Sequence, residues 1–163
     1  MKTFSPNCRG LGNPETVSKL HAIVRKEDPS IVFLMETRLE LHSLEFLRVR
    51  LGMRGCFGVE RHGYGGGLAM LWSASLALNI QSYSDHHIDA KVIQEDSLHW
   101  RLTGFYGHPE RAKRGHSWSL LRHLFGLRSV PWLVMGDFNE ITSLDEKWGR
   151  VDRSCRKWLL SEK

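Results

Sequence analysis

Residues 130–140 read Val130-Pro131-Trp132-Leu133-Val134-Met135-Gly136-Asp137-Phe138-Asn139-Glu140. The short apolar run, rich in β-formers, predicts a buried strand that Gly136 ends by allowing a sharp turn. Asp137 and Asn139 follow at the carboxyl end of that strand, with Phe138 turned inward. Because open α/β sheets place their chemistry above the carboxyl ends of strands, these two side chains predict a site there. A carboxylate and an amide aimed at one point suit a water molecule, a hard cation or a phosphate group.

Polar side chains also follow three other predicted strands. The apolar run 31–35 leads into Glu36, the run 100–105 leads into Tyr106, and residues 3–5 lead to Asn7. Oxygen ligands at strand ends favour Mg²⁺ or Mn²⁺ over Zn²⁺, and Mg²⁺ needs only one or two carboxylates besides water. Glu36 is therefore the candidate metal ligand, and a solvated charge at a strand end is the plainer alternative.

The rest of the pattern alternates helices and strands. Asn13-Pro14 supplies a cap and a first-turn proline for a helix that ends at Asp28-Pro29, and further helices are expected at 41–51 and 111–127. Their apolar stripes are Val17, Leu20, Ile23 and Val24; Leu44, Leu47 and Leu51; and Trp118, Leu121, Leu124 and Phe125. Short runs at 56–59, 68–72, 76–80, 88–93 and 100–102 predict antiparallel hairpins. This order predicts a layered α/β sandwich with mixed, largely antiparallel sheets.

Length and composition predict one ordered domain. The 163 residues are 41% hydrophobic and 25% charged, and a chain of this size buries roughly 70% of its unfolded surface. No apolar run is long enough to cross a bilayer, and the first residues lack the pattern of a secretory signal. Three widely spaced cysteines, Cys8, Cys56 and Cys155, indicate free thiols in a reducing, intracellular compartment. The formal charge of +5 favours the approach of a polyanion without identifying one.

Five short motifs occur in a specific order along most of the chain. They are Asn7-Cys8-Arg9-Gly10-Leu11-Gly12-Asn13-Pro14, Leu34-Met35-Glu36-Thr37, Gly65-Gly66-Gly67-Leu68-Ala69-Met70-Leu71-Trp72, Thr103-Gly104-Phe105-Tyr106-Gly107 and Gly136-Asp137-Phe138-Asn139. Through them the sequence resembles the endonuclease/exonuclease/phosphatase superfamily, and within it the apurinic-type endonuclease domain of plant non-LTR (LINE-like) retrotransposons. The resemblance implies a DNase I-like, four-layer α/β sandwich of two similar halves. This chain would supply the first half and the start of the second, as an incomplete domain at 1–144 and a charged, weakly structured tail at 145–163.

Each polar side chain has a candidate role in hydrolysing a phosphodiester. Asp137 orients or deprotonates the attacking water, and Asn139 holds a phosphate oxygen or that water. Their alternative is a turn in which both bond the local backbone. The resemblance implies that the Tyr106 hydroxyl contacts the scissile phosphate, whereas a core aromatic with a wet tip is the alternative. Asn7 would coordinate the cation or hold a phosphate, although Pro6 stands where the family usually has a tryptophan, and a plain N-terminal turn is its alternative.

Basic side chains near these strand ends could contact DNA phosphates, with a solvated basic face as the alternative. The candidates are Arg9, Arg38, Arg111 and Arg114. His108 is expected to be a solvated loop histidine. The segment Ser84-Asp85-His86-His87 resembles the Ser-Asp-His motif that completes the family's active site, but it precedes residues 136–139 instead of following them. We therefore interpret it as a hairpin turn.

Together these features predict Mg²⁺- or Mn²⁺-dependent phosphodiester hydrolysis on DNA, by an endonuclease of retrotransposon origin. No small organic cofactor and no membrane contact are expected, and a nuclear location is compatible with the composition. Because the chain ends before the family's C-terminal Asp and His motif, we expect impaired activity. Two alternatives stay open: a catalytically dead remnant that binds nucleic acid or a partner chain through its exposed half-sheet, and a phosphatase acting on smaller esters.

Overall fold

The computed structural model describes residues 1–60, 66–93, 99–127 and 130–140. The strands of the first sheet are β1 (Thr3–Phe4), β2 (Ile31–Met35), β3 (Gly55–Val59) and β4 (Leu68–Trp72). Those of the second sheet are β5 (Ala77–Ser84), β6 (His87–Ile93), β7 (His99–Tyr106) and β8 (Trp132–Asp137). The helices are α1 (Pro14–Glu27), α2 (Leu41–Arg50) and α3 (Arg114–Phe125), the last preceded by a 3₁₀ turn, η1 (Arg111–Lys113).

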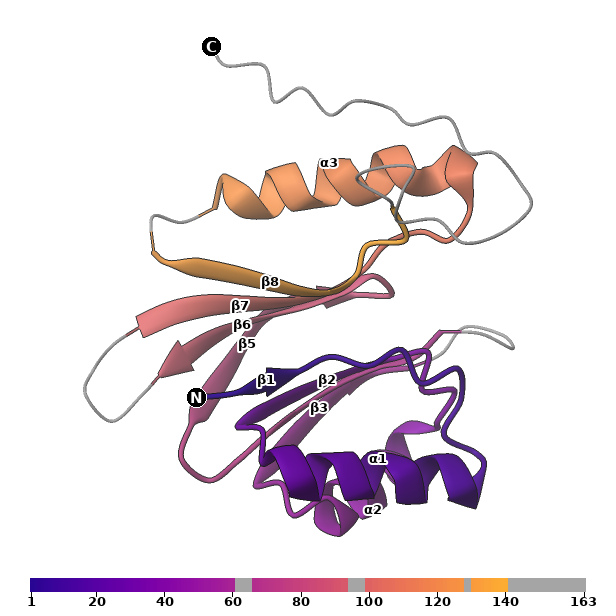
Figure 1. Cartoon of the computed structure of the whole chain (residues 1–163). Coiled ribbons are helices and arrows are strands. Elements are labelled where there is room, and N and C mark those ends of the chain that lie inside the picture. Colours follow the sequence, from indigo (N-terminus) through magenta and orange to yellow (C-terminus); the bar gives the residue numbers. More distant parts are fainter. Residues whose placement is uncertain (61–65, 94–98, 128–129, 141–163) are drawn as a thin grey trace.

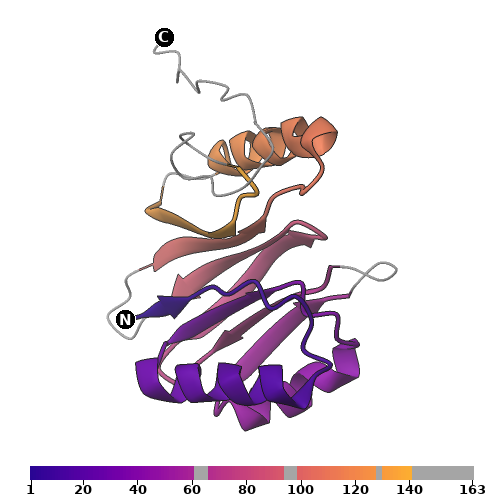
Figure 2. The ribbon, with the colours of Figure 1, turned by 45° about the vertical axis from the view of Figure 1, so that its right-hand side comes forward.

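The two sheets pack face to face, and helices cover their outer sides (Figure 1). The strand order is β1-β2-β4-β3 in the first sheet and β5-β6-β7-β8 in the second. Helices α1 and α2 lie against the first sheet and α3 lies against the second, a succession that Figure 2 shows from another side. The predicted layered α/β sandwich with mixed, largely antiparallel sheets is confirmed.

Helix α1 begins and ends at the residues that its sequence predicts. The Asn13 side chain accepts a hydrogen bond from Glu15 N at 2.9 Å, and the helix ends at Asp28, whose φ of 46° is left-handed. Leu20 and Val24 are buried against the first sheet, as predicted. Ile23 was expected on the same face but is 44% exposed, because the buried stripe of this helix is narrower than the four apolar positions suggested.

Strand β2 is buried on both faces. It pairs in parallel with β1 and antiparallel with β4, so β1, α1 and β2 form a β-α-β unit. Alternate side chains point to opposite faces, so Phe33 packs between the sheets while Val32 and Leu34 pack under the helices. Gly104 of β7 makes room for Phe33, because a Cβ atom at that position would lie 2.3 Å from the ring. Phe33 thereby joins the apolar cluster that fills the space between the two sheets.

Strand β8 differs from its prediction in extent and in burial. It starts at Trp132 and continues through Gly136 to Asp137, whereas we expected the strand to end before Gly136. The expected full burial is wrong: Leu133 is 41% exposed. The reason is its place in the sheet, since within the described residues β8 pairs with β7 alone.

The predicted helix at 111–127 is split into η1 and α3. Leu124 is buried as expected, but Phe125 is 73% exposed, and its ring meets Trp132 with centroids 6.1 Å apart. A helix on the outer face of a sheet buries one narrow stripe, and Phe125 lies beside that stripe rather than on it. The predicted tail at 145–163 and the expected end of the domain at 141–144 lie outside the described residues.

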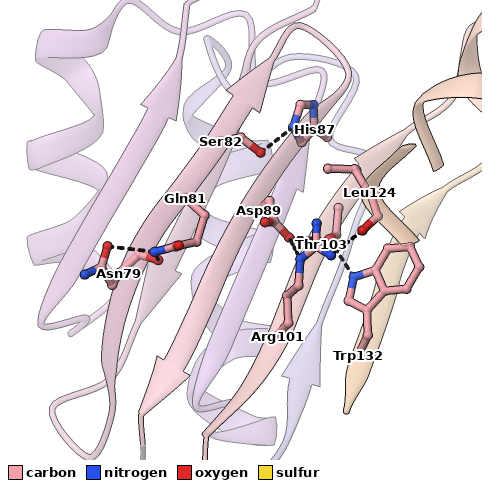
Figure 3. A network of polar contacts seen from close by, with 9 residues as sticks. All are labelled: Asn79, Gln81, Ser82, His87, Asp89, Arg101, Thr103, Leu124 and Trp132. Atoms are coloured by element: carbon pink, nitrogen blue, oxygen red, sulfur yellow. Dashed lines mark hydrogen bonds and ion pairs between the residues drawn. The ribbon is translucent and has the colours of Figure 1, made fainter. Parts of the chain in front are cut away.

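A buried polar network fixes α3 to the second sheet (Figure 3). Arg101 Nε donates to Asp89 Oδ1 at 2.7 Å, and the two side chains are 3% and 2% exposed. Thr103 Oγ1 donates to the same carboxylate oxygen at 2.7 Å. Arg101 also donates to the carbonyl of Leu124 in α3, and Trp132 Nε1 donates to Thr103 Oγ1 at 2.8 Å. The network therefore joins β6, β7, β8 and α3.

The described residues include two of the three cysteines and all of the helices given above. Cys8 and Cys56 carry free thiols, and Cys155 lies outside the described residues. In the part of the chain that the structure describes, no helix combines the length and apolar character needed to cross a membrane.

Candidate active site

The predicted polar residues lie at strand ends that meet at one edge of the sandwich. Glu36 follows β2 and Asn7 follows β1, while Tyr106 and Asp137 end β7 and β8. Each pair of strands is parallel, so the carboxyl ends coincide within each sheet. The two sheets are joined at this edge by a hydrogen bond of 3.1 Å from Asp137 N to the sulfur of Met35.

Hydrogen bonds connect four of these side chains. Asn7 Nδ2 donates to Glu36 Oε1 at 2.9 Å and to Asp137 Oδ2 at 3.2 Å. The Tyr106 hydroxyl donates to the same Glu36 oxygen at 2.7 Å. The two carboxylates are therefore separated only by one amide group, although Asn7 and Asp137 stand 130 positions apart in the chain.

Asp137 and Asn139 serve the local turn and the site at once. Asp137 Oδ1 accepts a hydrogen bond from Asn139 N at 2.9 Å. This bond belongs to the turn that we gave as the alternative role of these two residues. The second oxygen of Asp137 faces Asn7. Asn139 Nδ2 donates to the carbonyl of Gly107 at 2.7 Å, so this side chain holds the ends of β7 and β8 together.

Backbone strain is concentrated around these residues. Five non-glycine residues of the described chain have a left-handed φ, and four of them adjoin the site: Arg9 at 50°, Glu36 at 51°, Arg38 at 53° and Asn139 at 52°. A left-handed conformation costs a non-glycine residue roughly 1–3 kcal/mol and persists where surrounding contacts impose it. No sequence pattern had indicated this clustering.

Two glycines allow the strand ends to approach closely. Gly136 has a φ of 142°, and a Cβ atom there would lie 1.9 Å from the carbonyl oxygen of Phe105. A Cβ atom at Gly107 would lie 2.1 Å from the carbonyl oxygen of Phe138. Both positions therefore require glycine, and they set the separation between Tyr106 and Asp137.

The surroundings favour the ionised form of Glu36. Burial raises the pKa of its carboxyl, and the hydrogen bonds from Asn7 and Tyr106 lower it. The guanidinium groups of Arg38 and Arg9 lower it further, so that the net pKa of Glu36 lies below the ordinary value of 4.5. The site therefore holds a carboxylate across the neutral pH range.

The Tyr106 hydroxyl is held in its protonated form. Burial raises its pKa, and the hydrogen bond to Glu36 raises it further, as do the negative charges of Glu36 and Asp137. Asn139 opposes this shift in part. Tyr106 is therefore a hydrogen-bond donor in the site at every physiological pH.

Asn7 faces the carboxylates with the wrong atom for a metal ligand. Its Nδ2 points to them, and its Oδ1 accepts from Arg9 N at 3.2 Å. A cation binds the amide oxygen, so the predicted metal role of Asn7 requires this amide to turn. The carbonyl of Pro6 accepts from Met35 N at 3.2 Å, so the chain still pairs with β2 at this residue.

The oxygen atoms of the site fit a hard cation. Among the described residues no hydrogen bond reaches Glu36 Oε2, which leaves that atom for an ion, and Asp137 lies on the other side of the Asn7 amide. The described residues contain no cluster of three or more His, Cys, Asp and Glu side chains suited to a metal. One or two carboxylates with water are typical of Mg²⁺, so the donor set agrees with the predicted class of ion.

The four predicted DNA-binding arginines occupy two kinds of position. Arg9 and Arg38 are exposed beside Glu36, and Arg38 lies over Gly10. Arg111 is exposed in η1. The Arg114 side chain is only 11% exposed and forms an ion pair with Glu140, with an N–O distance of 3.3 Å.

Sequence reasoning missed a group of histidines beside Tyr106. The segment 84–87 is the predicted hairpin turn between β5 and β6, and it brings the His86 ring to 3.7 Å from that of His108, measured between centroids. His108 therefore packs against another side chain, whereas we expected it to be solvated. β6 pairs with β7 so that His87 lies opposite Phe105, and this register places His86 beside the end of β7. A correct prediction of that register would have revealed the contact.

Several solved structures share this fold at low sequence identity. A mannosyl-6-phosphatase from Bacteroides thetaiotaomicron is 16% identical with a TM-score of 0.63, over 84% of this chain and 64% of that protein. TDP2 from D. rerio, solved with a single-strand DNA product, is 17% identical with a TM-score of 0.63, over 85% and 60%. The human Nocturnin catalytic domain with bound sulfate is 17% identical with a TM-score of 0.60, over 85% and 64%. The chain thus spans less than two thirds of the length of each of these proteins.

The family follows from the sequence as a whole. No curated protein sequence matches the chain. The sequence profile described as the Endonuclease/Exonuclease/phosphatase family matches residues 5–158, which is most of its length. The chain therefore belongs to the endonuclease/exonuclease/phosphatase family.

Proposed function

We propose that this chain hydrolyses phosphodiester bonds in DNA with Mg²⁺ or Mn²⁺, as an endonuclease of the kind found in plant non-LTR retrotransposons. The observation that carries the proposal is the meeting of Glu36, Asp137 and Tyr106 around the amide of Asn7. Membership of the family supports phosphoester chemistry. The D. rerio structure, solved with a single-strand DNA product, supports DNA as the substrate class.

Each residue has a role that its surroundings support. Glu36 would hold the cation, and Asp137 would accept the proton of the attacking water or orient that water. When bound, the cation neutralises the phosphoryl oxygens and assists the leaving oxygen. Tyr106, whose raised pKa keeps its hydroxyl protonated, would turn that hydrogen from Glu36 Oε1 to a phosphate oxygen when the substrate binds. Asn139 fixes the strand ends through Gly107 and presents its oxygen to the water.

The exposed arginines beside the site extend the proposal to the DNA strand. Arg9 and Arg38 lie next to Glu36 in strained backbone positions, where they can pair with phosphates that flank the scissile one. Arg111 provides a further positive charge near the end of β7. Arg114 is engaged with Glu140, so we assign it the weakest contact with DNA. The expected impairment of activity stays a prediction that the assay below measures.

Nicking of supercoiled plasmid tests the proposed activity. We expect the purified chain to convert supercoiled plasmid to open circles with Mg²⁺ and to lose this activity with EDTA. Asp137→Ala and Glu36→Gln each remove a member of the site, which typically lowers such a rate by about 10²–10⁴-fold. Glu15→Gln, which changes an exposed residue of α1, is the control and should leave the rate unchanged. Equal cutting by wild type and Asp137→Ala would refute the site.

A phosphatase activity on small esters is the second candidate. The observation that favours it is the shared fold with the Bacteroides thetaiotaomicron mannosyl-6-phosphatase. Release of phosphate from mannose 6-phosphate, measured beside cleavage of bis-p-nitrophenyl phosphate, separates a monoesterase from a diesterase. If neither ester and no plasmid is cleaved while folded protein still retains DNA on a gel, the catalytically dead, nucleic-acid-binding remnant is the better description.

A further inference from the structure

A groove of about 440 Å³ lies where β3 and β5, each the last strand on one side of its sheet, come together. Its apolar lining includes Leu41 of α2, Phe57 and Val59 of β3, and Tyr83 of β5. The ring of Tyr83 meets that of Phe57 edge-on, with centroids 5.1 Å apart and 61° between the planes. Phe57 is half-buried, whereas 61% of Tyr83 is exposed. We call the hollow lined by these four residues the aromatic groove.

A shift in strand register turns Tyr83 toward the groove. Ile80 and Tyr83 are three positions apart, so a regular strand would place them on opposite faces of the sheet. The pairing of β5 with β6 shifts by one residue between Ile80 and Ser82, so that Ile80 lies opposite Ala90 and Tyr83 lies opposite Ile88. Ala90 and Ile88 both belong to the apolar cluster between the sheets, and Tyr83 therefore faces the first sheet. Bulges of this kind often re-aim a side chain beside a functional site.

The aromatic groove lies at the same edge of the sandwich as the candidate active site. In the first sheet the last residues of β3 and β2 both lie opposite Leu68, and in the second sheet the ends of β5 and β7 both lie opposite His87. The groove is therefore level with Glu36 and Tyr106 and two strand spacings away from them, which is about 10 Å. A strand bound at the candidate active site can reach it with a neighbouring nucleotide.

Two carboxylates decide which part of a nucleotide suits the groove. Glu60 and Asp85 are exposed and complete its lining, and their negative charge repels a phosphate. An uncharged base does not meet this repulsion, and its amino group can donate to a carboxylate oxygen. Every base also has a π-face that stacks on an aromatic ring. The groove therefore combines a stacking surface with acceptors for the edge of a base.

We propose that the aromatic groove binds one base of the nucleic-acid strand held at the candidate active site, with that base stacked on the exposed ring of Tyr83. Phe57 is a positioning residue, because its edge-on contact sets the angle of the Tyr83 ring. The groove contributes to substrate affinity and does not contact the scissile phosphate. Its role in cleavage rests on the proposed function, whereas the stacking itself requires neither a metal nor cleavage.

Two single-stranded probes of equal charge measure the stacking in EDTA. One is a deoxycytidine octamer, and the other is an octamer in which tetrahydrofuran units replace the nucleosides, so that only the backbone remains. Tyr83→Ala should weaken binding of the cytidine octamer about tenfold, a loss within the range of one base–aromatic stack, and should not change binding of the base-free octamer. Tyr83→Phe keeps the ring and should match wild type with both probes. The ring-proton resonances of Tyr83 should move upfield when the cytidine octamer is added.

Phe46→Ala is the matched control, because this ring is 70% exposed on α2 and lies outside the groove. It should leave both affinities unchanged. The proposal is overturned if folded wild type does not bind the cytidine octamer, or if folded Tyr83→Ala weakens both probes equally or neither. Base-dependent binding by a protein that nicks no plasmid would leave the groove standing and remove the proposed activity. Nicking without base-dependent binding would retain that activity and remove the groove.

Discussion

The hydroxyl of Tyr106 donates a hydrogen bond of 2.7 Å to Oε1 of Glu36, and this bond joins the ends of two strands that lie in different sheets. One residue is the last of β7 and the other follows β2. The bond therefore depends on how the two sheets pack, and it links the protonation of Glu36 to that of Tyr106.

Replacing Tyr106 with phenylalanine should change the pH dependence of activity. In the free protein the hydroxyl lowers the pKa of Glu36 by donating to it, so Tyr106→Phe should move the acidic limb of the kcat/KM profile to higher pH. The maximal rate should fall by about 10- to 100-fold, the size of effect expected when one donor to the reacting phosphate is lost. Plasmid nicking from about pH 4 to pH 8 measures both effects. Tyr83→Phe, at a side chain that is 61% exposed, should match wild type.

Glu36 should make stability depend on pH. Its pKa in the folded protein lies below the ordinary value of 4.5, so its ionisation contributes stability that is present above the unfolded-state pKa. That contribution is lost as the pH falls through the folded-state pKa. In urea denaturation from about pH 6 to pH 3, wild type should therefore lose unfolding free energy more steeply than Glu36→Gln. Parallel curves for the two proteins would contradict this assignment.

Gly136→Ala should destabilise the domain strongly. The added Cβ atom would lie 1.9 Å from the carbonyl oxygen of Phe105, at a φ of 142°, so the strand end must move. We expect a loss of about 3 kcal/mol or more in the free energy of unfolding, measured with urea. Gly12→Ala is the matched control, because a Cβ atom at Gly12 meets nothing within 4 Å. Its effect should stay within about 0.5 kcal/mol.

Replacing both members of the buried pair Arg101 and Asp89 should lower the free energy of unfolding by less than the two single replacements added together. Asp89→Leu or Arg101→Met alone leaves one charge buried without its partner, which typically costs about 3–5 kcal/mol. Changing both to apolar residues, Asp89→Leu with Arg101→Met, should cost less than the sum of the single changes. Lys113→Met breaks an exposed pair and should cost less than about 1 kcal/mol. Strictly additive losses in urea would argue against the coupling in Figure 3.

The sequence predicted elements where local signals agree. Asn13-Pro14 and Asp28-Pro29 bound α1 correctly, and the apolar run 31–35 identified β2. The boundaries of β8 were less well predicted, because Gly136 was read as a turn and continues a strand instead. Local propensity does not contain the information that this glycine faces the backbone of Phe105.

The sequence identified the residues of the candidate site but not the contacts between them. Their positions at strand ends identified Glu36, Asp137 and Tyr106, since a polar residue that follows an apolar run can be recognised in the amino-acid sequence. The direction of the Asn7 amide was not visible, and it faces the carboxylates with nitrogen. The strained φ of Glu36 was equally hidden, because such a conformation is imposed by surrounding contacts and not by the residue itself.

By itself the amino-acid order determined which segments are helices and strands, and which polar residues stand at the strand ends, because these follow from period, capping and turn chemistry within a few residues. Only the tertiary structure decided that Asn7 bridges Glu36 and Asp137, and that His86 meets His108. Those contacts join parts of the chain far apart in sequence, and they depend on how two sheets pack around Phe33 and Gly104. Packing of that kind is a property of the whole core and is not carried by any single stretch.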